Sequence, residues 1–88
     1  MNELQLDSVQ QKMHQGAYES ALDSLKEILS DDPNDALAHG FLALVLLSTG
    51  RRYAAEYEAG LALSLEPNYA FLHWIKAKIF FSITVKSL

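Results

Sequence analysis

Residues in this chain recur at an interval of 34 positions. The Asp-Pro-Asn tripeptide at 32–34 is matched by Glu-Pro-Asn at 66–68, and Gly16 is matched by Gly50. A fixed period of this length indicates one supersecondary unit that is repeated, with each copy burying its hydrophobic face against the next. The same interval relates further pairs of identical residues: Ala21 and Ala55, Leu29 and Leu63, His39 and His73, Ala43 and Ala77.

Between these turns, apolar residues recur at steps of three and four, which predicts five helices. Glycine favours the position just past a helix end, so Gly16 and Gly50 are expected to close the first and third helices. Asn34 or Asp35 is expected to cap the third helix after the first proline turn. That helix is apolar nearly all round, which predicts burial between neighbours. The expected ranges are about Glu3 to Gln15, Tyr18 to Ser30, Ala36 to Ser48, Arg52 to Leu65, and Tyr69 onward.

Composition narrows the classes of function. The chain has no cysteine, which excludes disulfides and thiolate metal sites and fits a reducing compartment, and its start is unlike a secretory signal; we expect a cytoplasmic protein. No stretch reaches the roughly 18 consecutive apolar residues of a membrane span. The net charge of −4 divides into an acidic stretch at 1–35 and a mildly basic stretch at 36–88. The basic residues are scattered rather than gathered in a stripe, so we expect no nucleic-acid partner.

The spacing of reactive side chains predicts neither catalysis nor metal binding. The serines lack the glycine-flanked turn of an activated nucleophile. The acidic cluster at 31–35 lacks the twelve-residue spacing of a calcium loop. His39 and His73 occupy equivalent positions, but no third ligand accompanies them, and we interpret them as packed histidines. We therefore expect no enzymatic activity, no catalytic residue, no metal and no cofactor.

The repeated unit resembles the tetratricopeptide repeat. The run at 16–18 (Gly-Ala-Tyr), followed by Ala21 and Leu25, is similar to the turn and second helix of that family. The family's usual tryptophan position holds His39 and His73 instead. Further residues at matching positions are Leu42, Ala43, Leu46, Gly50, Ala55, Ala62, Pro67, Ala77 and Phe80.

The resemblance implies an all-α fold of antiparallel helix-turn-helix units stacked as a short right-handed superhelical solenoid of about five helices. It implies one domain over residues 1–88. The first repeat is expected at about 2–35 and the second at about 36–69, followed by a half repeat or capping helix at about 70–85.

In this family the first helices of successive repeats line a concave groove that binds partner segments. An apolar groove suits an amphipathic helix or an extended hydrophobic segment, which predicts a protein-binding adaptor or small chaperone. The competing interpretation is that the same residues are core or are covered by self-association. The family positions correspond here to Leu6, Gln10, Met13, Gly40 and Leu47, and to the seven groove candidates Leu37, Phe41, Leu44, Phe71, Trp74, Lys78 and Phe81.

The last expected helix is apolar over most of its circumference, although a terminal repeat helix normally shows a polar outer face. Leaving four or five large side chains in water would forgo about 1.5–3 kcal/mol each. We therefore expect a cover: a second copy, a partner protein or further repeats. Self-assembly through this helix, head to tail or about a two-fold axis, is the alternative function. Its interface candidates are Trp74, Ile79, Phe80 and Ile83.

Overall fold

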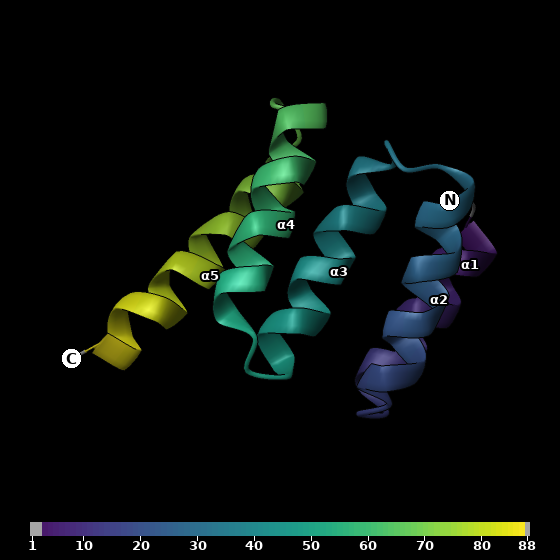
Figure 1. Cartoon of the computed structure of the whole chain (residues 1–88), viewed down its shortest axis with the longest axis horizontal. Coiled ribbons are helices and arrows are strands. Elements are labelled where there is room, and N and C mark those ends of the chain that lie inside the picture. Colours follow the sequence, from purple (N-terminus) through teal and green to yellow (C-terminus); the bar gives the residue numbers. More distant parts are fainter. Residues whose placement is uncertain (1–2, 88) are drawn as a thin grey trace.

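The computed structural model describes residues 3–87, which form five α-helices and, within that range, no strand. Helices α1 and α5 lie at opposite ends of a row, and α2 and α4 lie in front of them in the view of Figure 1. The row measures 39 × 29 × 18 Å. The architecture is the all-α repeat solenoid expected from the sequence, with bounds that differ from expectation by one residue at most. The helices are α1 (Glu3–His14), α2 (Tyr18–Asp31), α3 (Ala36–Ser48), α4 (Arg52–Leu65) and α5 (Ala70–Ser87).

The 34-residue period of the sequence is also a period of the backbone. Helices α2 and α4 begin and end at equivalent positions of the repeat. Helices α3 and α5 also begin at equivalent positions. Gly16 and Gly50 have φ of 76° and 83°, a left-handed conformation that glycine adopts without a steric penalty. After each glycine the chain returns a hydrogen bond to the preceding helix, 2.8 Å from the Ala17 N–H to the Lys12 carbonyl and 2.9 Å from the Arg51 N–H to the Leu46 carbonyl. The same C-terminal motif therefore ends α1 and α3.

The first proline turn begins α3 with a side-chain cap. The Asp35 carboxylate accepts a hydrogen bond of 3.0 Å from the Ala38 N–H, which satisfies one of the free donors at the start of the helix. Partial burial acts to raise the pKa of the Asp35 carboxyl. The hydrogen bonds that the carboxyl accepts, including the one from Ala38, outweigh burial and leave the pKa below its usual value. Of the two expected caps, Asp35 is the one used.

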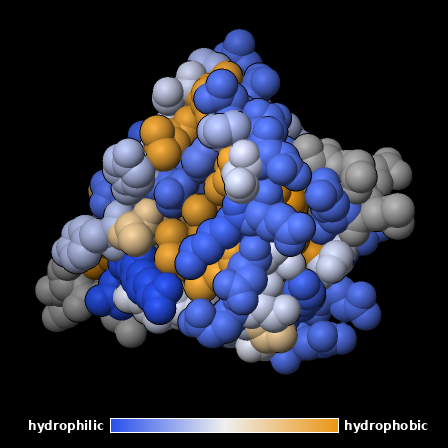
Figure 2. Space-filling view, turned by 45° about the vertical axis from the view of Figure 1, so that its right-hand side comes forward, coloured by the Kyte–Doolittle hydropathy of each residue, from blue (hydrophilic) through white to orange (hydrophobic). Residues whose placement is uncertain are grey.

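The core lies between the helices and is centred on α3, as its apolar circumference predicts. Helix α3 packs against α2, α4 and α5, and Gly40 of α3 lies beside Leu72 and Ile75 of α5. A Cβ at Gly40 would lie 2.6 Å from Leu72 Cδ2, so only glycine fits there without rearrangement. Helix α4 contributes small buried residues that let its backbone approach α3: Ala55, Ala59 and Ala62. The face shown in Figure 2 is largely hydrophilic, with hydrophobic patches between the hydrophilic residues.

Candidate functional site

An open pocket of about 400 Å³ lies where α1, α3 and α5 converge near the start of α2. Each of the three helices contributes residues three or four positions apart, so each offers one stripe of a single face. On α3, for example, Leu44 follows Phe41 by three positions and Ser48 follows Leu44 by four. The lining residues are Gln10, Met13, His14, Tyr18, Phe41, Leu44, Ser48, Phe71 and Trp74.

Three neighbouring aromatic rings form one wall of the pocket. The ring centroids of Phe41 and Phe71 lie 5.5 Å apart, and those of Phe71 and Trp74 lie 5.8 Å apart with the planes inclined by 15°. The wall runs from buried to exposed, since Phe41 is 4% exposed and Trp74 is 53% exposed. Lys78 Nζ lies 5.5 Å from the centroid of Trp74, within reach of a cation–π interaction. The wall thus joins the core of the repeat to its surface.

The structure brings together four of the seven groove candidates: Phe41, Leu44, Phe71 and Trp74 all line the pocket. Leu37 packs against the core, and Phe81 is 69% exposed but outside the lining. Lys78 is outside the lining, and its ammonium group lies over the ring of Trp74. Whether these residues bind a partner stays a prediction.

Of the other positions taken from the resemblance, some line the pocket and some do not. Gln10 and Met13 line the pocket, and the side chain of Leu6 lies outside the described residues. The prediction that Gly40 lines the groove was wrong, because Gly40 packs against Leu72 and Ile75 of α5. Leu47 is partly buried against the core. The sequence reasoning missed three lining residues, His14, Tyr18 and Ser48; helical spacing from Gln10 and Leu44 points to the first and last of them.

The predicted oligomer interface also needs correction. Ile79 is 1% exposed and lies in the core, so it cannot touch a second copy in this fold. Helix α5 buries Leu72, Ile75 and Ile79 at steps of three and four, and this stripe is the side that packs against the rest of the chain. Ile83 is partly buried against the same core, whereas Phe80 is 68% exposed.

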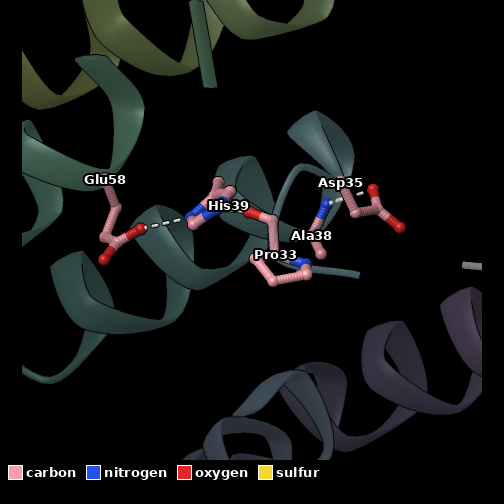
Figure 3. A network of polar contacts seen from close by, with 5 residues as sticks. All are labelled: Pro33, Asp35, Ala38, His39 and Glu58. Carbon is pink, nitrogen blue, oxygen red and sulfur yellow. Dashed lines mark hydrogen bonds and ion pairs between the residues drawn. The ribbon is translucent and has the colours of Figure 1, made fainter. Parts of the chain in front are cut away.

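A polar network ties the second repeat together (Figure 3). His39 Nε2 lies 2.8 Å from the Pro33 carbonyl oxygen, and His39 Nδ1 lies 2.6 Å from Glu58 Oε2 on α4. Both partners are acceptors, so both contacts are hydrogen bonds only when both ring nitrogens carry a proton. The His39 and Glu58 side chains are 13% and 18% exposed. The ring therefore links α3, α4 and the preceding turn.

Among residues 3–87, no group of three or more His, Asp or Glu side chains is placed to hold a metal ion. His39 and His73 are each bonded to a proline carbonyl, Pro33 and Pro67 respectively. Within the same described range, no helix combines the length and the hydropathy needed to cross a membrane.

The sequence profile of the tetratricopeptide repeat matches residues 12–70 of the 88. The chain belongs to the tetratricopeptide repeat family. Tetratricopeptide repeats generally mediate protein–protein interactions. A comparison with curated proteins found no match. In the repeat, His39 and His73 stand where the family usually has tryptophan, and the structure shows that the imidazole joins the helix to the preceding proline turn.

Proposed function

We propose that this tetratricopeptide repeat chain is an interaction module, an adaptor or a small chaperone of the cytoplasm, that binds an apolar partner segment in its pocket. The observation that carries the proposal is the continuous aromatic wall of Phe41, Phe71 and Trp74, which reaches from the core to an open surface. A volume of about 400 Å³ is in the range of pockets that hold ligands. We also propose that residues 1–88 act as one domain, with units at about 2–35, 36–69 and 70–85.

The lining specifies the chemistry of the partner segment. Among the residues that the structure describes, no carboxylate, lysine or arginine belongs to the lining, and its polar groups are a few neutral donors and acceptors and the imidazole of His14. A charged segment would leave its charges without partners there, at a cost in desolvation. An amphipathic helix or an extended segment with hydrophobic side chains at the contact suits this surface, and its backbone can bond to groups such as Gln10 and Ser48.

Peptide display tests the proposal. Peptides selected on the full chain are titrated against it, and the fluorescence of Trp74, the single tryptophan, reports binding. We expect the selected peptides to be rich in apolar residues and to lose affinity for the Leu44→Lys variant, which places an ammonium group at the pocket. The control is Tyr53→Lys on α4, where the ring is 75% exposed and outside the pocket. Equal loss in both variants, or no loss in Leu44→Lys, would refute the pocket as the site.

Self-assembly through α5 is the second candidate, and the exposure of Phe80 (68%) and Phe81 (69%) favours it. Light scattering behind size-exclusion chromatography, over a dilution series, separates the two accounts. A monomer at all concentrations supports the interaction module. A discrete oligomer that survives dilution and is broken by Phe80→Glu supports self-assembly.

A further inference from the structure

Helix α5 has a second exposed surface, apart from the pocket, which we name its outer face. Each of the four residues that form this face lies 34 positions after a residue of α3, on the side of α3 that faces α4. On α3, three of these residues follow His39 by three, four and seven positions and so share the side on which His39 meets Glu58. The outer face of α5 consists of His73, Lys76, Ala77 and Phe80, which correspond to His39, Leu42, Ala43 and Leu46.

The equivalent surfaces differ in burial. On α3, Leu42, Ala43 and Leu46 are 9%, 0% and 9% exposed, and α3 makes its most extensive contact with α4. On α5 all four residues are exposed, and Phe80 is 68% exposed. The outer face therefore has the shape and spacing of a surface that accepts a helix in the preceding repeat.

The two histidines show what such a helix would present. His73 Nε2 lies 2.6 Å from the Pro67 carbonyl oxygen, as His39 Nε2 lies 2.8 Å from that of Pro33. The same hydrogen bond thus holds both rings to their turns. In His39, Nδ1 meets the Glu58 carboxylate, whereas His73 Nδ1 has no hydrogen-bond partner among residues 3–87. A helix packed on α5 as α4 packs on α3 would bring its own carboxylate to this atom, and the two would form a hydrogen bond when both nitrogens of the His73 ring carry a proton.

Charge narrows the occupant further. The sequence of α5 contains lysines and no acidic residue, and Lys76 replaces Leu42 within the outer face. Two copies of α5 paired about a two-fold axis would bring Lys76 near its own counterpart, and like charges in contact destabilise an interface. A helix with carboxylates beside its apolar stripe complements both His73 and Lys76.

We propose that the outer face of α5 docks an amphipathic helix of a partner protein, with a stripe of small apolar residues and a glutamate bonded to His73. Small residues let the backbone approach Ala77, as Ala55, Ala59 and Ala62 of α4 approach α3. The apolar stripe covers the exposed ring of Phe80. This surface does not depend on the pocket, so it stands or fails separately from the proposed function.

A synthetic peptide of residues 51–66, acetylated and amidated, is the probe, because it is the chain's own example of such a helix. It is titrated into the isotope-labelled full chain and followed by nuclear magnetic resonance. We expect saturable shifts at the amides of Lys76, Ala77 and Phe80 and at the His73 ring nitrogens. The Glu58→Gln peptide should bind about fivefold more weakly, the loss expected for one charge-assisted hydrogen bond near the surface.

Two chain variants make the test specific. His73→Ala should bind both peptides with equal affinity, because the carboxylate has lost its hydrogen-bond donor, and Phe80→Glu should bind neither. Both residues are exposed, so both variants keep the fold. Leu44→Lys is the matched control and should leave binding unchanged. No saturable shift, shifts confined to the pocket, or a self-associated chain that Phe80→Glu returns to monomer would overturn the proposal, the last in favour of a second copy as the occupant.

Discussion

Helices α3 and α5 begin at equivalent positions of the repeat. The side of α3 that faces α4 is buried, whereas the equivalent side of α5 is exposed. Ala43 is 0% exposed and its counterpart Ala77 is exposed, although both are alanine. Leu46 is 9% exposed and its counterpart Phe80 is 68% exposed. Burial at a repeat position therefore depends on which helix lies next to it and not on the residue type.

The difference is confined to one side of the two helices. Ala38, Phe41 and Val45 of α3 are buried, and so are Leu72, Ile75 and Ile79 at the equivalent positions of α5. Both helices thus pack in the same way on the preceding part of the chain. What α5 lacks, among the described residues, is a helix on its outer face.

The largest expected difference between the two helices is in the free energy of unfolding when a large side chain is truncated at equivalent positions. Leu46→Ala should lower the free energy of unfolding by about 2–5 kcal/mol, because it opens a cavity in the core. Phe80→Ala should change it by less than about 0.5 kcal/mol, because the ring is mostly in water. Urea unfolding of the monomer measures both. Similar losses in the two variants would mean that Phe80 is packed after all.

The contact between α3 and α5 can be tested at a glycine. Gly40→Ala places a methyl group 2.6 Å from Leu72 Cδ2, and we expect a loss of about 1–3 kcal/mol from overpacking. Gly60→Ala is the matched control in α4, where nothing lies within 4 Å of the added carbon. That substitution should stabilise the chain by about 0.5–1 kcal/mol, because alanine favours the helix. A Gly40→Ala variant as stable as Gly60→Ala would contradict the close packing of the two helices.

The two histidines give a smaller difference. A double-mutant cycle with His39→Ala and Glu58→Ala should show a coupling free energy of about 1 kcal/mol in unfolding, because the contact is short and the two side chains are largely buried. His73→Ala should cost less, because the exposed ring keeps only its bond to the Pro67 carbonyl. If the coupling free energy of His39 and Glu58 were zero, this pair would no longer support the proposed bond between His73 and a glutamate of a partner helix.

The cap of α3 gives an effect of similar size, together with a dependence on pH. Asp35→Ala should cost about 1 kcal/mol, the usual value for a lost cap. The folded pKa of Asp35 is lowered, so its charged form stabilises the fold above the unfolded value of about 3.9. This contribution is lost as the pH falls through the lower folded pKa. Acid unfolding of Asp35→Ala should therefore be less steep there than that of the exposed-site control Asp23→Ala.

The sequence predicts the helices well, because their determinants are local. Apolar spacing sets the helices, and Gly16 and Gly50 end two of them with a conformation that other residues avoid. The packing side of α5 was not predictable in the same way. Phe71, Ile79 and Phe80 are all apolar, and only the positions of α3 and α4 decide which of them is buried.

The pocket was predictable in part, for the same reason. The resemblance to the tetratricopeptide repeat placed Phe41 and Trp74 in the groove, and both line the pocket. It placed Gly40 in the groove, whereas the helix packs that position against Leu72. Tyr18 enters from the start of α2, and no spacing on the first helices indicates it.

The most direct test of the interaction module is the indole resonance of Trp74, which gives a single signal because the chain has one tryptophan. The ring stacks on Phe71 at the pocket and lies on a different side of α5 from Phe80. The account predicts that an apolar peptide selected on the chain shifts this signal saturably, and that Leu44→Lys prevents the shift. A peptide that binds tightly and leaves the Trp74 signal unmoved would contradict the pocket as the binding site.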